Sequence, residues 1–115
     1  NVAVKSPSFD GATYLDKMLS PPSDVKSKSD TIKIKSETDA VYSGVSGDVK
    51  LADSGRKGPL TIDSYLGWSD TVVWNPYGNE GMGFDSFICV ESAQASSPVS
   101  LAPGEYWTGA MKVKP

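Results

Sequence analysis

Thr31-Ile32-Lys33-Ile34-Lys35 alternates strictly between isoleucine and a polar residue. Because successive side chains of a β-strand point to opposite faces, the isoleucines are predicted to face a core and the lysines to face water. Leu60-Thr61-Ile62-Asp63 alternates in the same way, and Thr71-Val72-Val73-Trp74 has the composition of a more fully buried strand. These stretches predict strands that pack one apolar face against a core.

Short runs of β-favouring residues recur along the whole chain, separated by turn signals that contain glycine or proline. No amphipathic helical window longer than a turn or two interrupts this pattern. Such spacing predicts antiparallel sheets, so we expect an all-β fold, an antiparallel β-sandwich or a piece of one. The predicted strands are Val2–Val4, Thr13–Asp16, Thr31–Ser36, Val41–Ser43, Asp48–Leu51, Leu60–Tyr65, Thr71–Trp74, Ser86–Glu91, Val99–Leu101 and Glu105–Val113.

The length of 115 residues allows a single domain, residues 1–115, with one hydrophobic core. Residues 20–30 are rich in serine, lysine and aspartate, and we expect them to form a solvent-exposed polar loop. The net charge of −3 and the scattered basic residues argue against nucleic acid as a partner.

No apolar stretch approaches the roughly 18 residues that a membrane helix needs, so the sequence predicts a soluble protein without a membrane span. The chain begins at Asn1 rather than at a methionine. This start fits either a trimmed targeting peptide or the tail of a longer polypeptide.

The chain contains no histidine and a single cysteine, Cys89. One cysteine excludes an internal disulfide and a zinc site of the four-ligand cysteine/histidine type, and Cys89 is predicted to be a small core residue. Histidine is the usual proton-transfer residue near pH 7. Acid/base chemistry would therefore rely on carboxylates or on residues outside this chain.

Glu91 ends the apolar, strand-like run Phe87-Ile88-Cys89-Val90-Glu91. A carboxylate in line with core-building residues must be paired, protonated or used, because burial of an unpaired charge is costly. Glu91 either sits at the strand end and reaches water or a lysine, or acts as a general base held in a cleft. Asp39 presents a similar choice between binding ligand hydroxyls and closing an Asx-turn.

Trp74-Asn75-Pro76-Tyr77 places an indole at the end of a predicted strand, where proline stops the ladder. Sugar rings stack their C–H faces on indole, and their hydroxyls need charged or amide partners. Trp74 and Asn75 are therefore candidate sugar-binding residues beside the carboxylates. The alternative is that Trp74 belongs to the core.

Several sequence blocks follow one another in order along nearly the whole chain. They are Gly11-x-Thr13-Tyr14-Leu15-Asp16-Lys17-Met18, Thr38-Asp39-x-Val41-Tyr42, Asp70-Thr71-Val72-Val73-Trp74-Asn75-Pro76, Cys89-Val90-Glu91 and Leu101-x-Pro103-Gly104-Glu105-x-Trp107-Thr108-Gly109. This series resembles the C-terminal part of the hexose-6-phosphate mutarotases, or glucose-6-phosphate 1-epimerases, in the aldose 1-epimerase superfamily. The tryptophan-asparagine-proline and cysteine-x-glutamate blocks together are the most specific part.

The resemblance implies a galactose-mutarotase-like β-supersandwich and the interconversion of α and β anomers of hexose 6-phosphates without cofactor or metal. Glu91 matches the general base that takes the proton from the anomeric hydroxyl, and Asp39 matches an aspartate that binds sugar hydroxyls. The family's acid is a histidine upstream of the matched segment, and this chain has none. The resemblance is compatible with a cytoplasmic location or with an organelle such as a plastid.

Two hypotheses follow. The chain either supplies the base of a mutarotase site that another segment completes, or it is a catalytically silent carbohydrate-binding or structural subunit of a larger assembly. A chance similarity of a generic β-sandwich interaction domain is a third possibility. A sandwich cut roughly in half would expose strand edges, so we expect a missing N-terminal half or another protein chain to cover them.

Overall fold

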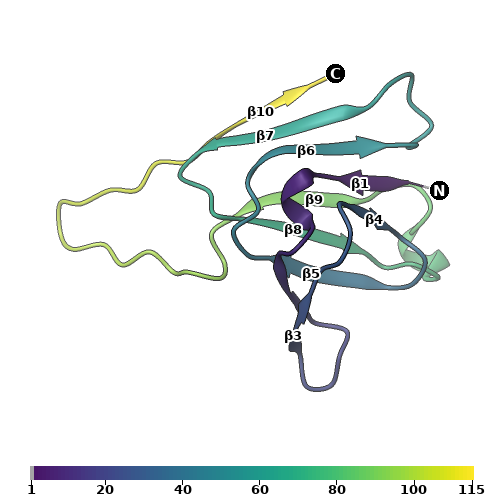
Figure 1. Cartoon of the computed structure of the whole chain (residues 1–115), viewed down its shortest axis with the longest axis horizontal. Coiled ribbons are helices and arrows are strands. Elements are labelled where there is room, and N and C mark those ends of the chain that lie inside the picture. Colours follow the sequence, from purple (N-terminus) through teal and green to yellow (C-terminus); the bar gives the residue numbers. More distant parts are fainter. Residues whose placement is uncertain (1) are drawn as a thin grey trace.

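The computed structural model describes residues 2–115 and contains two five-stranded sheets in which every pairing is antiparallel. The strands are β1 (Ala3–Lys5), β2 (Thr13–Asp16), β3 (Ser23–Lys26), β4 (Thr31–Lys33), β5 (Thr38–Tyr42), β6 (Gly47–Ala52), β7 (Leu60–Leu66), β8 (Asp70–Asn75), β9 (Cys89–Ala93) and β10 (Ala110–Lys114). Two short 3-10 helices, η1 (Pro7–Phe9) and η2 (Glu80–Met82), complete the elements. Figure 1 shows their arrangement.

Sheet I has the strand order β10-β7-β6-β1-β4, and sheet II has the order β3-β2-β5-β8-β9. The inner faces of both sheets contribute to one cluster of buried side chains. The Ser64 hydroxyl on β7 and the Ser92 hydroxyl on β9 lie 2.6 Å apart and link the sheets by a hydrogen bond. The predicted all-β sandwich is therefore confirmed.

The core is built from the inward-facing residues that the alternating pattern selects. Val4 of β1, Val49 of β6 and Val73 of β8 are almost completely buried. Phe9 in η1 is fully buried and packs 4.8 Å from the Tyr42 ring. η1 begins where the Ser6 side chain accepts a hydrogen bond from the Ser8 amide, and this cap directs Phe9 into the core.

Two sequence predictions about local structure need correction. Residues 20–30 are largely exposed, as expected, but they are not all loop, because β3 forms within them and pairs with β2. Residues Val99–Leu101 and the segment 105–109 form no strand. Ladder bonds require a neighbouring strand, and β3 has one in β2 while residues 99–101 have none.

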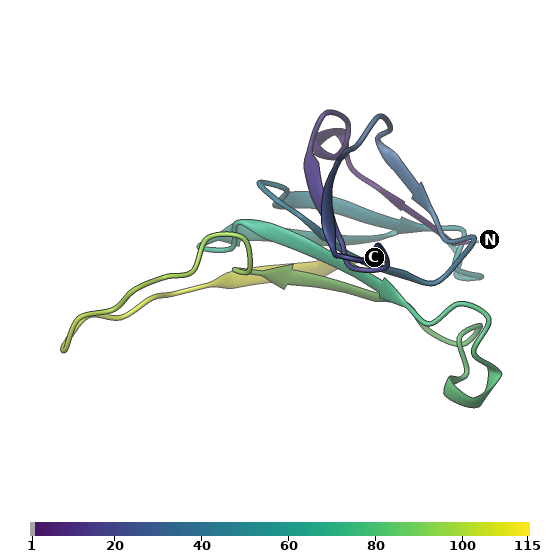
Figure 2. The ribbon, with the colours of Figure 1, turned by 90° about the horizontal axis from the view of Figure 1, so that it is seen from below.

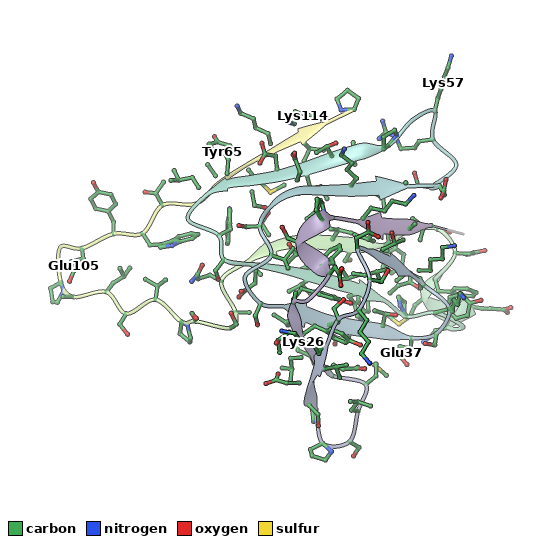
Figure 3. All side chains as sticks on the ribbon, viewed as in Figure 1. Lys26, Glu37, Lys57, Tyr65, Glu105 and Lys114 are labelled. Carbon is green, nitrogen blue, oxygen red and sulfur yellow. The ribbon has the colours of Figure 1, made fainter. Side chains whose placement is uncertain are left out.

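Residues 94–109 form a long extension, here called the arm, between β9 and β10. Figure 2 shows the arm projecting well beyond the two sheets, and Glu105 lies at its far end in Figure 3. The chain reverses there in a turn closed by the bond from the Glu105 amide to the Ala102 carbonyl. Near the base of the arm, Trp107 packs edge-on against Trp68 with ring centroids 4.7 Å apart.

Within residues 2–115, no helix has the length and apolar character needed to cross a membrane.

Candidate functional site

The outer face of sheet II carries most of the predicted site residues. Val73 points into the core, so its neighbours Val72 and Trp74 on β8 point to the opposite face. The strand register then defines a row of outward side chains that crosses the whole sheet. From edge to edge this row is Asp24, Leu15, Val41, Val72 and Glu91.

Glu91 lies in the middle of β9, the last strand of sheet II, and its side chain is exposed. Its register partner on β8 is Val72, and no salt bridge to Glu91 is formed within residues 2–115. The apolar run that precedes Glu91 is thus part of an edge strand with one solvent-facing side. Its carboxylate lies in water, which is the usual environment of a glutamate, and it is accessible to a ligand.

Asp39 and Trp74 share this face in the adjacent row, where Asp39 pairs with Trp74 and Trp74 pairs with Cys89. Asp39 lies within β5 rather than in an Asx-turn. Its carboxylate is 3.9 Å from the Lys17 ammonium, a long and partly exposed ion pair. Trp74 is half-buried on this outer face rather than in the core, and it packs 5.6 Å from the Phe87 ring.

These positions bring the two predicted carboxylates to either side of the indole. β8 separates β5 from β9, so Asp39 and Glu91 are about 10 Å apart across the sheet, and Glu91 is also displaced along β9 by two residues from Cys89, the register partner of Trp74. Trp74 lies between them on the same face. The arrangement can stack a sugar ring on indole and offer a carboxylate to its hydroxyls from each side.

A shallow, open hollow of about 490 Å³ lies on the same face, on the β2 and β5 side of Asp39. Its lining mixes polar and apolar side chains, and neither Trp74 nor Glu91 belongs to it. Its lining comes from Leu15, Lys17, Asp24, Val41, Ser43, Ala95 and Ser96.

Asn75 does not join this group. It alternates with Trp74, so it points to the inner side of sheet II, where it is buried. Its amide nitrogen donates to the Phe84 carbonyl at 2.9 Å and to the Phe87 carbonyl at 2.7 Å. The structure therefore gives Asn75 a positioning role: it holds the loop that places Phe87 against Trp74, and it is no longer a candidate ligand residue.

Asp70 was not recognised from the sequence, yet it organises the edge of this face. Its buried carboxylate accepts hydrogen bonds from the Ala95 amide at 2.8 Å, the Ser96 amide and hydroxyl at 2.7 Å, and the Gly44 amide at 3.3 Å. Burial alone would raise the pKa of Asp70, but the hydrogen bonds from Ser96, Ala95 and Gly44 lower it below its ordinary value. Asp70 is thus an ionised anchor for the base of the arm.

Cys89 differs from the predicted core residue. It is half-buried on the outer face beside Trp74, and burial together with the nearby Glu91 carboxylate raises the pKa of its thiol. A raised pKa keeps the sulfur protonated and unreactive at neutral pH. Within residues 2–115, no group of three or more histidine, cysteine, aspartate or glutamate side chains is placed to hold a metal ion.

The chain matches no protein-family model. It is 32% identical over 88 residues to a protein of Cenchrus ciliaris named "Putative glucose-6-phosphate 1-epimerase". This chain has a distant, family-level link to the glucose-6-phosphate 1-epimerases. The match covers 70% of this chain but only 26% of the Cenchrus protein, so it spans about a quarter of that relative's length. The link agrees with the resemblance read from the sequence blocks, whereas the C-terminal placement stays a prediction.

Proposed function

We propose that the outer face of sheet II forms one wall of a hexose 6-phosphate mutarotase site, in which Glu91 is the general base. The single observation that carries this proposal is that Glu91, Asp39 and Trp74 share one accessible face. The similarity to a protein named as a glucose-6-phosphate 1-epimerase supports the same chemistry.

In this mechanism the Glu91 carboxylate takes the proton from the anomeric hydroxyl as the bond between C1 and the ring oxygen breaks. The ring oxygen must gain a proton from an acid in the same step. The open-chain aldehyde then turns, and the ring closes on the other face of the carbonyl carbon to give the other anomer. Asp39 would accept hydrogen bonds from ring hydroxyls while Trp74 packs on the sugar's C–H face. No cofactor or metal is needed for these steps.

The acid is not a histidine of this chain, because the chain contains none. In the proposed site another polypeptide segment, either a preceding half or a partner chain, supplies the acid and covers the open side. A hexose phosphate substrate is compatible with a site in the cytoplasm or in an organelle such as a plastid.

Anomer exchange tests the proposal. The native polypeptide that carries these residues is mixed with α-glucose 6-phosphate, and exchange between anomers is followed by NMR. We expect exchange faster than in buffer and a decrease of about 10² to 10⁴-fold in the Glu91→Gln variant, which is the usual contribution of a general base. Asp48→Asn is the control and should leave the exchange rate unchanged, because Asp48 is an exposed carboxylate on β6 of the other sheet. Equal exchange rates in Glu91→Gln and the wild type would refute the assignment.

The lack of histidine also favours a second candidate function, a silent carbohydrate-binding or structural subunit. The same NMR experiment distinguishes a mutarotase from a silent subunit. A silent binding protein would shift the sugar and Trp74 resonances on addition of glucose 6-phosphate without changing the rate of anomer exchange.

A further inference from the structure

One side of the sandwich is open where β9 ends sheet II and β10 ends sheet I. Val73 on β8 is completely buried, but its register partner Val90 on β9 is only partly buried. Across the core, Ile62 on β7 is 8% exposed, whereas its partner Val113 on β10 is 54% exposed. Burial therefore falls off in both sheets toward this side.

The edge strands of the two sheets differ in how well they are protected against pairing with another chain. Lysine and short length are common means of preventing an edge strand from pairing with another chain. β3, β4 and β10 each contain lysine, and β4 has only three residues. Among the edge strands of residues 2–115, β9 is the one without lysine, and it has five residues with the sequence Cys-Val-Glu-Ser-Ala.

We propose that the free edge of β9 is a strand-addition site that accepts an extended strand of a partner polypeptide in which hydrophobic and basic residues alternate. A strand paired with β9 would lie about 4.8 Å from it and would continue sheet II over the exposed side chains of β10. Its inward residues would then cover Val113 and Met111, which is 42% exposed. This proposal does not depend on the mutarotase function.

The negative charge of Glu91 is the reason that we expect basic residues in the partner strand. Glu91 points outward from β9 and has no cationic partner within residues 2–115. A lysine or arginine opposite Glu91 would form a favourable cross-strand pair, while a carboxylate there would be repelled. For the same reason, antiparallel pairing of two copies of β9 centred on Glu91 is disfavoured, because it places like charges opposite each other.

Peptide titration of the full 115-residue chain tests the site. The probe is the capped peptide KVTVKVTVK, added to ¹⁵N-labelled protein, with EVTVEVTVE as the charge-reversed control. We expect saturable shifts at residues 89–93 and at Met111 and Val113, slower amide exchange along β9, and weaker binding of the acidic peptide. Glu91→Lys should weaken binding of the basic peptide about tenfold, because an attractive cross-strand pair becomes repulsive.

Asp24→Lys on β3 is the matched control, since Asp24 is an exposed carboxylate on the opposite edge of the same sheet. It should leave the affinity within twofold of the wild type. Glu91→Gln serves as a second variant that removes the charge without reversing it, and an intermediate affinity is expected. Shifts confined to β3, β4 or β10, or no saturable shift at all, would overturn the proposal. Concentration-dependent shifts of residues 89–93 without peptide would instead identify a second copy as the occupant.

Discussion

Replacement of Asp70 by asparagine should loosen the base of the arm and lower the stability of the whole domain. The buried Asp70 carboxylate accepts three amide hydrogen bonds and one hydroxyl hydrogen bond, at distances from 2.7 to 3.3 Å. In Asp70→Asn the remaining oxygen can still accept the hydrogen bonds from the Ala95 and Ser96 amides. The new NH₂ group then faces the Gly44 amide, which loses its acceptor, while the Ser96 hydroxyl can rotate to accept.

The cost follows from these contacts. The new NH₂ group lies at a fully buried position, and its N–H that faces the Gly44 amide has no acceptor; one buried N–H without a partner costs about 1–3 kcal/mol. The two retained bonds change from charge-assisted to neutral, which reduces each to about half its strength. Together these effects predict a loss of about 2–4 kcal/mol in the free energy of unfolding at pH 7. Asp48→Asn is the control, because Asp48 is an exposed carboxylate on β6 and its replacement should change stability by no more than about 0.5 kcal/mol.

The loss of stability caused by Asp70→Asn should also depend on pH. The pKa of Asp70 is lowered in the folded state, so its stabilising effect is fully present above the ordinary aspartate pKa of about 3.9 and is lost as pH falls through the lower folded value. We therefore follow urea unfolding of the wild type and of Asp70→Asn between pH 7 and pH 2.5. Their free energies of unfolding should converge below about pH 4. A variant as stable as Asp48→Asn at pH 7, or a gap that stays constant down to pH 2.5, would contradict this account of Asp70.

Four further variants test other parts of the structure. Phe9→Ala should cost about 3–5 kcal/mol in urea unfolding, because Phe9 is fully buried against Tyr42, and a loss below 1 kcal/mol would argue against that packing. Asn75→Ala should cost about 2 kcal/mol and speed amide exchange in residues 76–88, since two carbonyls lose their donor, and unchanged exchange would contradict the bracing role. Gly109→Ala should separate Trp68 from Trp107 and change tryptophan fluorescence, because an added Cβ would overlap both rings, whereas Gly81→Ala in exposed η2 should leave the spectrum unchanged. Lys17→Met should change stability by less than about 0.5 kcal/mol, because its ion pair with Asp39 is long and partly exposed, and a larger loss would mean that this pair is structural.

Local periodicity was enough to predict most of the strands. The predicted strand Thr13–Asp16 coincides with β2, and the Leu60–Tyr65 run lies within β7. β3 was missed because its sequence, Ser-Asp-Val-Lys, is polar, and only its pairing with β2 makes it a strand. Conversely, Val99–Leu101 has strand-like residues but no neighbouring strand, so it stays irregular in the arm. Pairing, which is non-local, decides both cases.

The candidate site shows the same limit. Thr71-Val72-Val73-Trp74 has apolar residues at successive positions, so nothing local says which of them face the core. The register with β5 and β9 decides that Trp74 lies on the outer, candidate face of sheet II and Asn75 on the inner face. Asp70 could not be recognised because its hydrogen-bond partners lie about 26 positions away in the chain.

The position of Glu91 connects the proposed chemistry with the open side of the sandwich. A general base needs a substrate on one side and an acid within reach of the ring oxygen. β9 is the last strand of sheet II, so residues 2–115 provide a surface on only one side of Glu91, toward β8 and Trp74. A strand added to the free edge of β9 would place its side chains about 4.8 Å away on the other side. The edge that lacks lysine and the carboxylate that lacks a partner thus lie at the same place, and occupation of that edge would enclose the site from the side that this chain leaves open.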